Sequence, residues 1–303
     1  IWKAVKALQE QGYAIESLPS TGYRLRQKAD ILTRDAICEA LHVPLKLHLL
    51  DKVDSTNNYA KTLSDLSLPQ LVVSEEQTAG RGRLGRSFYS PAGKGIYMSF
   101  AFCPRLELSQ AMLVTTMTAV AVCRALESLT GLRPKIKWVN DIYLNEKKLC
   151  GILTEAETNF ETGEIQKIIV GIGINCFEDA AMPPELREVA TFLDKPQESF
   201  DRNALIAAIA NEFFDMLAHF DRAKIVRDYR ARSFILGQQI LIFNPAIARA
   251  IGRPDNRLSE GIRARAIDID ENGGLVVEDL EGTKSRQMET LSTGEISVRK
   301  VYD

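Results

Sequence analysis

The chain of 303 residues is long enough for about two domains and a small third unit. Its hydrophobic fraction of 45% and charged fraction of 26% are ordinary for a globular protein, and its net charge of −2 excludes a global basic field for nucleic acid or membranes. We expect no secretory signal and no apolar run approaching the ~20 residues that span a bilayer.

Cysteine and histidine usage limits the redox and metal chemistry. The five cysteines are scattered, odd in number and without a CxxC pair, which favours reduced thiols in a cytoplasmic protein over a disulfide framework. The three histidines have no metal-ligand spacing, so a zinc site is not expected, and their separation suggests no histidine-based triad.

The first predicted unit, residues 1–28, is a helix followed by a hairpin. Ile1, Val5 and Leu8 fall on one helical face, and residues 13–18 and 22–25 predict two short strands. The unit is too small to hold a core alone, and the chain begins inside a helical pattern, so we expect a truncated start. It resembles the recognition helix and wing of a winged helix-turn-helix domain. A helical appendage packed on the main domain is an equally weighted alternative.

Residues 29–235 predict a domain of mixed helices and strands. Thr33 is the expected N-cap of a helix ending at residue 41, a second helix follows Ser55 and its neighbours to residue 66, and residues 112–129 predict a long apolar helix. Two more helices are expected within residues 202–232. Strands are predicted at residues 47–50, 71–73, 96–102, 136–141, 147–153 and 168–175, with a tight turn at 145–146.

The pattern changes from about residue 238 to short strands separated by turn signals. These strands are predicted at residues 240–243, 262–269, 275–277 and 296–299. Their spacing predicts a small all-β barrel in residues 236–303. The fold class of the whole chain is therefore α+β.

The most informative segment is the glycine–arginine loop, residues 77–88. Its interleaved glycines and arginines allow close backbone approach and supply forked cationic donors, which suits a loop that wraps an anion. The loop formally matches the dinucleotide motif GxGxxG, but no helical pattern follows and Pro91 would stop a helix, so a Rossmann site is not expected. The alternative is a mobile surface loop with solvated arginines.

Six motifs in this order resemble those of bacterial biotin–protein ligases of the bifunctional ligase and repressor type. They cover residues ~45 to 300 and comprise residues 55–57, 80–86, 137–141, 148–153, 171–175 and 294–299. The resemblance implies a central mixed sheet of the class II aminoacyl-tRNA synthetase and biotin ligase type. It also implies a C-terminal SH3-like barrel and an N-terminal winged helix.

The activity implied by the resemblance has two steps. The biotin carboxylate attacks the α-phosphate of ATP, giving biotinyl-5′-AMP and pyrophosphate, and a lysine of an acceptor protein then takes the biotin and releases AMP. Both steps need positive charge in a dry pocket and no nucleophile from the enzyme.

The implied biotin site combines polar partners for the ureido head with cations for the carboxylate. On the residues alone, Ser55 and Thr56 are more simply helix caps, and Lys148 is a turn lysine beside Lys147. Lys148, Arg81 and Arg83 are the implied catalytic residues. The biotin set is Ser55, Thr56, Asn57, Gln77, Gly80, Arg81, Arg83, Lys148 and Gly151.

The implied ATP site lies on the other side of the same cations. Phe88 stands where the family often has a tryptophan stacking on adenine, and Val139 replaces the usual proline. Asn140 and Asp141 are otherwise a common turn pair, and Asp141 is the candidate ligand for magnesium. The ATP set is Arg83, Arg86, Phe88, Lys137, Asn140, Asp141, Asn175 and Arg299.

Two other functions remain open from the residues: lipoate or octanoate transfer, and a ligase-inactive regulator that senses biotin and binds DNA. The resemblance also implies partners. These are the biotin carboxyl carrier protein of acetyl-CoA carboxylase, a homodimer with adenylate bound, formed at the exposed edge of the central sheet, and operator DNA for the full-length chain. Because the earlier helices are missing, we expect weak or absent operator binding from this chain.

Overall fold

The structure is a computed structural model. It describes residues 1–10, 14–18, 21–27, 30–104, 111–159, 161–193, 201–243, 261–280, 288–292 and 297–300.

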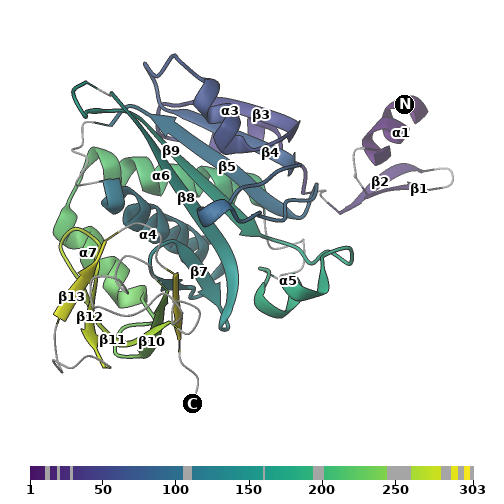
Figure 1. Ribbon diagram of the computed structural model, residues 1–303. Helices are drawn as coiled ribbons and strands as arrows, with labels where there is room; N and C mark the ends of the chain where they lie inside the picture. Colours follow the sequence, from purple (N-terminus) through teal and green to yellow (C-terminus); the bar gives the residue numbers. More distant parts are fainter. Residues whose placement is uncertain are drawn as a thin grey trace.

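A seven-stranded mixed sheet forms the middle of the molecule (Figure 1), in the order β3-β4-β5-β9-β8-β7-β6. β3 and β4 run parallel and the other neighbours run antiparallel. The central mixed sheet that the sequence predicted is therefore confirmed. Its strands are β3 Lys46–Val53, β4 Gln70–Gln77, β5 Gly95–Phe102, β6 Lys135–Lys137, β7 Asp141–Leu144, β8 Lys147–Thr158 and β9 Ile165–Asn175.

Helices cover both faces of this sheet (Figure 1). On one face α4 (Ala111–Thr130), α6 (Arg202–Ala218) and α7 (Arg222–Arg232) bury the main apolar core. On the other face α3 (Thr56–Thr62) packs over β5 and β9 and buries a small second cluster around Ala60. The remaining short elements are α2 (Arg34–Ala40), η1 (Arg83–Gly85) and α5 (Pro184–Val189).

Two helix starts test the predicted caps. The Thr33 side chain accepts a hydrogen bond from the backbone of Ala36 and caps α2, as predicted. Ser55 occupies the N-cap position of α3, but its hydroxyl makes no capping hydrogen bond, so the cap interpretation of its side chain is wrong. α3 also ends at Thr62 rather than at residue 66.

The predicted single strand over residues 136–141 is wrong, because the chain turns at residues 138–140 between β6 and β7. The Trp138–Val139 peptide bond in this turn is cis. The Trp138 indole is buried and donates from Nε1 to the Gly273 carbonyl, 2.9 Å away in the C-terminal sheet. The local pattern assigned Trp138 to a strand, but its side chain is instead buried in a long-range contact with the C-terminal sheet. The tight turn between β7 and β8 is confirmed, with positive φ at Asn145 and Glu146.

The C-terminal region forms a five-stranded antiparallel sheet in the order β13-β12-β11-β10-β14. The sequence pattern missed β13, which is only four residues long. A Cβ on Gly273, at the β11–β12 turn, would lie 2.7 Å from Thr116 Oγ1, so glycine lets this turn dock closely on α4. The strands are β10 Gln239–Phe243, β11 Ile262–Ile269, β12 Leu275–Asp279, β13 Met288–Leu291 and β14 Ser297–Lys300.

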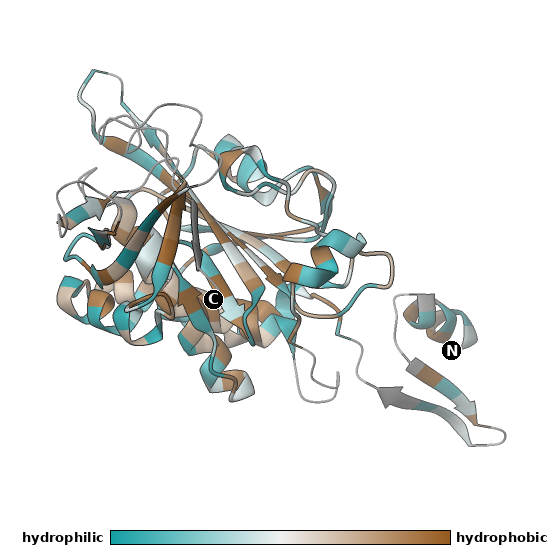
Figure 2. Cartoon of the chain, turned by 60° about the horizontal axis from the view of Figure 1, so that its bottom comes forward, coloured by the Kyte–Doolittle hydropathy of each residue, from teal (hydrophilic) through white to brown (hydrophobic). Residues whose placement is uncertain are grey.

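The N-terminal unit consists of α1 (Trp2–Glu10) and the antiparallel hairpin of β1 (Ala14–Leu18) and β2 (Gly22–Gln27), as predicted. Figures 1 and 2 show it standing to one side of the main body. Trp2 of α1 is 63% exposed. This placement favours a separate module over an appendage packed on the main domain.

The central helix corrects the expectation about apolar runs. By length and composition, Met112–Thr130 is long and apolar enough to cross a membrane. However, 72% of the most apolar window is buried inside the protein, because α4 lies at the centre of the core. Its apolar composition is therefore accounted for by packing.

Candidate active site

A cavity of about 710 Å³ opens on the face of the central sheet that carries α3. Its walls come from the start of α3, the end of β4, the glycine–arginine loop, β8, β9 and the β6–β7 turn, so motifs far apart in the sequence meet here. The predicted residues that line it are Ser55, Thr56, Asn57, Gln77, Arg81, Arg83, Arg86, Phe88, Lys137, Asn140, Asp141, Lys148 and Gly151.

Phe88 lies across glycines on the floor of the cavity. Gly173 of β9 pairs with Gly151 of β8, and a Cβ on Gly173 would come 2.6 Å from the Phe88 ring. The Phe88 backbone donates to the carbonyl of Gly80, where a Cβ would lie 2.4 Å from Phe88 O. The ring also meets the edge of Tyr97, with centroids 6.4 Å apart. Phe88 therefore packs against sheet backbone, and its stacking on adenine stays a prediction.

A buried polar network forms one end of the cavity. The Gln77 side-chain oxygen accepts from the Thr56 backbone N–H at 2.9 Å and from the Thr56 hydroxyl at 3.1 Å. The Gln77 amide nitrogen donates to Ser90 Oγ at 2.9 Å, and Ser99 Oγ lies 2.8 Å from Thr56 Oγ1. These contacts set the orientation of the Gln77 amide, so polar groups stand in a defined geometry beside an otherwise apolar floor.

Asn57 forms part of the wall with both ends of its amide engaged. Its Oδ1 accepts from Ser99 Oγ at 2.7 Å, and its Nδ2 donates to Glu155 Oε2 at 2.9 Å and to the Leu153 carbonyl at 3.3 Å. A Cβ on Gly171 of β9 would come 2.3 Å from Asn57 Oδ1, so this glycine lets the amide lie on the sheet. Asn57 therefore shapes the wall through these contacts.

The glycine–arginine loop folds back on itself over the cavity. Arg81 and Ser87 form an isolated antiparallel bridge, and the Gly82 backbone donates to Arg86 O at 2.7 Å. Between them lies the short turn η1, in which Leu84 has a φ of 58°. No α-helix begins in this loop, whereas the dinucleotide motif includes a helix that starts at the glycines.

The first loop arginine is held beside α3. Arg81 Nη1 donates to Asn58 Oδ1 at 2.9 Å, and Nη2 lies 3.4 Å from Glu155 Oε1. Lys61 Nζ lies 2.7 Å from the same carboxylate oxygen. Burial favours a higher pKa for Glu155, but the hydrogen bonds from Lys61 and Asn57 and the nearby cations outweigh it and hold the pKa below its ordinary value.

The second loop arginine reaches the β6–β7 turn. Arg83 Nη1 donates to Asn140 Oδ1 at 3.2 Å, and Asn140 Nδ2 donates to the Ile152 carbonyl at 2.7 Å. Burial lowers the pKa of Arg83, while the negative charge of Asp141 opposes that shift. Arginine keeps its charge at neutral pH in either case, so the loop brings a cation into a partly desolvated place.

Lys148 and Asp141 form an ion pair across β7 and β8. Lys148 Nζ lies 2.6 Å from Asp141 Oδ1, without the geometry of a hydrogen bond, and that oxygen is buried. Asn175 does not line the cavity; its Nδ2 donates to the Lys148 backbone carbonyl at 3.4 Å. The ammonium is therefore positioned by a carboxylate that is itself a predicted ligand-binding residue.

Three other predicted residues have distinct positions. Lys137 lies with Nζ 5.4 Å from the centre of the Tyr143 ring, a cation–π contact at the cavity wall. Gly80 does not line the cavity, but closes the loop onto Phe88. Arg299 lies in β14, where its backbone pairs with Leu241 of β10. Its side chain lies outside the described part of the chain, so its contact with the nucleotide stays a prediction.

Sequence reasoning did not place Ser99 or Glu155 in the site, and it included Gly171 and Gly173 in one of the six motifs without giving them a role. The alternation of Gly171 and Gly173 in an apolar strand was a usable signal, because glycine in a strand marks close approach of another group. Ser99 and Glu155 carried no signal, since a serine or glutamate within a strand pattern is ordinary.

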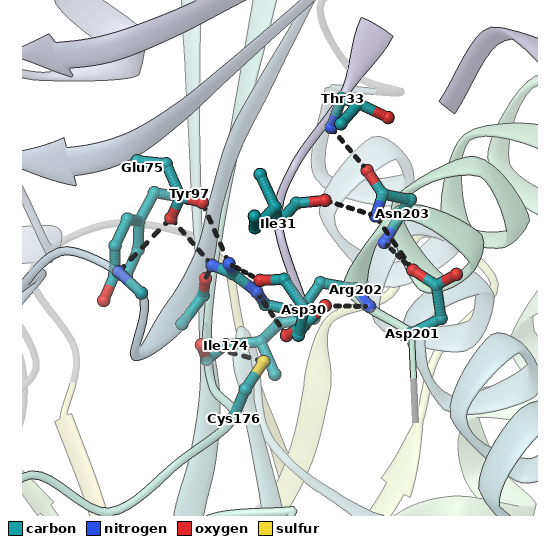
Figure 3. A network of polar contacts seen from close by, with 12 residues as sticks. Asp30, Ile31, Thr33, Glu75, Tyr97, Ile174, Cys176, Asp201, Arg202 and Asn203 are labelled. Atoms are coloured by element: carbon teal, nitrogen blue, oxygen red, sulfur yellow. Dashed lines mark hydrogen bonds and ion pairs between the residues drawn. The ribbon is translucent and has the colours of Figure 1, made fainter. Parts of the chain in front are cut away.

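A second polar network supports the segment behind the loop (Figure 3). Arg202, at the start of α6 and 1% exposed, donates from Nε to Asp30 Oδ2 at 2.7 Å and from Nη2 to Glu75 Oε1 at 2.9 Å. Glu75 also accepts from the Gly93 backbone at 3.2 Å, and Arg202 Nη1 donates to the Gly95 carbonyl at 2.9 Å. The chain that leaves the loop is thereby anchored to a buried ion network.

Comparison with known proteins matches both the central region and the C-terminal region to models of biotin or biotin/lipoate protein ligases. Residues 49–175 match the Biotin/lipoate A/B protein ligase family, and residues 257–299 match the Biotin protein ligase C terminal domain. The Bifunctional ligase/repressor BirA of Bacillus subtilis (strain 168) is 34% identical over 291 residues, covering 94% of this chain and 86% of that protein. Its Escherichia coli (strain K12) counterpart is 29% identical, covering 73% of this chain and 68% of that protein.

The solved structures agree. The Biotin protein ligase from Aquifex aeolicus in complex with biotin and ATP superposes with a TM-score of 0.68 at 27% identity, covering 84% of this chain and 99% of that one. The ligase from Leishmania major in complex with Biotinyl-5-AMP gives 0.54 at 25% identity, covering 83% of this chain and 100% of that one. With a mixed central sheet, a small antiparallel C-terminal sheet and this degree of identity, the chain belongs to the biotin protein ligase family.

Proposed function

We propose that this chain is an ATP-dependent biotin–protein ligase that forms biotinyl-5′-AMP and transfers the biotin to a lysine of an acceptor protein. One observation carries the proposal: a single cavity brings the Lys148–Asp141 pair together with Arg81 and Arg83 over a floor with few side chains and a polar end. Relatives whose structures hold biotin with ATP and Biotinyl-5-AMP support it.

The polar end suits the head of biotin. Thr56 and Gln77 present oriented donors and acceptors beside the floor on which Phe88 packs, as a ureido group in an otherwise apolar pocket requires. Ser55, buried at 1% exposure with no capping role, adds a hydroxyl. Gly151 leaves room for the Lys148 side chain, because a Cβ there would lie 3.3 Å from its Cε and Nζ.

The cations suit the reacting groups. Lys148 and Arg83 stand where the biotin carboxylate and the α-phosphate are brought together, and charge that develops on the phosphoryl oxygens is stabilised by positioned cations in a low-dielectric place. The carboxylate oxygen attacks the α-phosphorus, and pyrophosphate leaves with the bonding electrons. Arg86, Lys137, Asn140, Asn175 and Arg299 are assigned to the nucleotide as the resemblance implies.

The Asp141 carboxylate suits a magnesium ion that is held mainly by the phosphates of ATP. Its buried Oδ1 makes no hydrogen bond and is ion-paired with Lys148, and magnesium commonly takes one or two carboxylates together with substrate oxygens. Within the part of the chain that the structure describes, no cluster of three metal-ligating side chains occurs, so a cage made by these protein residues is not the arrangement proposed. Magnesium would supply charge neutralisation on the phosphates.

We also propose the finer organisation and the partners. Residues 1–28 are assigned to a winged-helix unit, residues 29–235 to the catalytic domain and residues 236–303 to an SH3-like barrel. The acceptor is a biotin carboxyl carrier protein of acetyl-CoA carboxylase. The protein would repress transcription as an adenylate-bound homodimer on operator DNA, paired through an exposed edge of the central sheet, such as β3. The relatives named bifunctional ligase/repressor support this assignment.

A cytoplasmic location is proposed from the thiols, since the five cysteines are free and two of them, Cys38 and Cys103, are exposed.

The test is isothermal titration with biotin alone, then with ATP and magnesium, while pyrophosphate is measured. We expect tight biotin binding and one pyrophosphate per chain. Biotin binding without pyrophosphate would instead identify a sensor, and lipoate binding without biotin binding would identify a lipoate ligase. The match of residues 257–299 to the Biotin protein ligase C terminal domain favours biotin over lipoate.

A further inference from the structure

We propose that Glu155 is a positioning residue for the ligase reaction: its carboxylate holds Arg81, and through Arg81 the start of the glycine–arginine loop, against α3 beside the cavity. The inference rests on the proposed role of this loop in binding the carboxylate and phosphates. Glu155 lies outside the six motifs and carried no signal in the sequence.

The strand geometry places Glu155 at the border of the cavity. Alternate residues of β8 share a face, so Gly151, Leu153 and Glu155 all point to the side that carries α3. Gly151 and Leu153 line the cavity, whereas Glu155 stands one step further along and does not. Its side chain is 23% exposed. Glu155 therefore acts on a bound ligand through another residue.

Buried residues below Glu155 determine the orientation of its carboxylate. Ser99, with no exposed surface, donates to Asn57 Oδ1, so that Asn57 Nδ2 faces Glu155 Oε2 at 2.9 Å. The other oxygen, Oε1, is thereby turned to Lys61 Nζ at 2.7 Å and Arg81 Nη2 at 3.4 Å. A chain of buried contacts thus sets where Arg81 is held.

The charges of the loop explain why such a carboxylate is needed. Arg81, Arg83 and Arg86 fall within six residues, and like charges this close repel. Glu155 pairs with the first of these arginines, Arg81, at 3.4 Å and so offsets part of this repulsion. Without it the loop would sample more conformations, and ligand binding would have to offset the cost of ordering them.

Glu155→Gln tests the proposal, because it keeps the shape and removes the charge. We expect the KM values for biotin and ATP to rise about two- to fivefold, as for a partly exposed ion pair, with kcat changed less than about twofold. Trypsin, without added ligand, should cut after the loop arginines faster than in the wild type. Biotin with ATP and magnesium should restore protection.

Glu157→Gln is the matched control. Glu157 lies two residues further on the same face of β8 and pairs with Lys167 at 3.2 Å, away from the loop, so neither KM nor loop cleavage should change. Glu155→Asp, which keeps the charge, should recover most of the loop protection. Cleavage sites are mapped by mass spectrometry, since general unfolding would speed cleavage along the whole chain.

A double variant separates this proposal from the proposed function. If Glu155 acts through Arg81, then Glu155→Gln in an Arg81→Gln background adds nothing to the biotin Kd or to cleavage after Arg83 and Arg86. Unchanged KM and cleavage in Glu155→Gln, or tighter biotin binding, would overturn the positioning role. An unchanged biotin Kd in Arg81→Gln alone would instead remove the assumed role of the loop arginine.

Discussion

Two regions of the molecule use arginine in opposite ways. Arg202 is 1% exposed, and its guanidinium meets the carboxylates of Asp30 and Glu75 as well as two backbone carbonyls. Arg81 and Arg83 line a cavity and are partly exposed; their described contacts include an ion pair at 3.4 Å and a neutral amide. A buried arginine that is paired with carboxylates stabilises the fold, whereas a partly exposed arginine can still bind an anionic ligand.

The pKa of Arg202 reflects the same contrast. Burial alone would lower the pKa, but the hydrogen bonds and negative charges of Glu75 and Asp30 raise it well above the ordinary arginine value. For Arg83 burial is the larger effect, and its pKa is lowered. A cation whose charged form is disfavoured by burial gains more from an arriving anion.

The largest expected effect is on the buried network. Arg202→Met should reduce the free energy of unfolding by about 3–5 kcal/mol, because it leaves the Asp30 and Glu75 carboxylates in a buried place without their cation. Urea unfolding measures this. Lys52→Met, at an exposed pair with Glu76, is the control and should cost less than about 1 kcal/mol. If Arg202→Met also lost less than about 1 kcal/mol in free energy of unfolding, the contrast between Arg202 and the loop arginines would be wrong.

The next effect is on chemistry. Lys148→Met should slow biotin-dependent pyrophosphate release about 10²- to 10³-fold, as loss of one positioned donor to a charged transition state does, while unfolding stability changes by less than about 1 kcal/mol. A radioactive ATP–pyrophosphate exchange assay measures it, with Lys52→Met again as the control. Full activity in Lys148→Met would show that this cation belongs to the fold, as Arg202 does.

A smaller effect is expected at the floor of the cavity. Gly173→Ala puts a Cβ 2.6 Å from the Phe88 ring, and overpacking of this kind costs ~1–3 kcal/mol, so biotin affinity should fall about tenfold. Calorimetric titration of biotin gives the affinity. Gly173→Ala should also lower the melting temperature, because of the same crowding. Adding Phe88→Leu, which shrinks the crowding side chain, should recover part of that loss. If it recovers none, the clash lies elsewhere.

The smallest effect is a pH dependence at Glu155. Its pKa in the folded protein lies below the ordinary glutamate value of 4.5, so Lys61 and Arg81 favour its charged form. The stability that it contributes is therefore present above about pH 4.5 and lost as the pH falls through the lowered pKa. Wild type and Glu155→Gln should differ by less than about 1 kcal/mol in urea unfolding at pH 7 and converge in acid. A constant difference at every pH would exclude the charge as the cause.

Local patterns predicted the elements well where one feature dominated. The apolar period of residues 112–129, the Thr33 cap and the turn at Asn145 all appear in the structure, because cap chemistry, helical period and turn geometry act within a few residues. The break at residues 138–140 and the strand β13 were missed. The first depends on the Trp138–Gly273 contact, 135 positions apart, and the second is a short strand that needs β12 as its partner.

The site divides in the same way. The glycine–arginine loop and the Lys148 motif could be recognised from the sequence, because chemistry that handles carboxylates and phosphates needs particular residue types at close spacing. Ser99 and Glu155 could not, because each matters only through a partner that the strand register brings alongside. The register of β8, β9 and β5 sets Gly173 beside Gly151 and Gly171 beside Ser99.

The sequence by itself determined the family, the order of most elements and the set of cations available for an anionic ligand, since these depend on residue type and local period. Only the tertiary structure decided which cations are committed to the fold and which line the cavity, and which carboxylate each one meets. The physical reason is that pairing and desolvation of a charge depend on neighbours distant in the chain. Arg202 and Arg81 are the same residue type, and only burial and partners distinguish them.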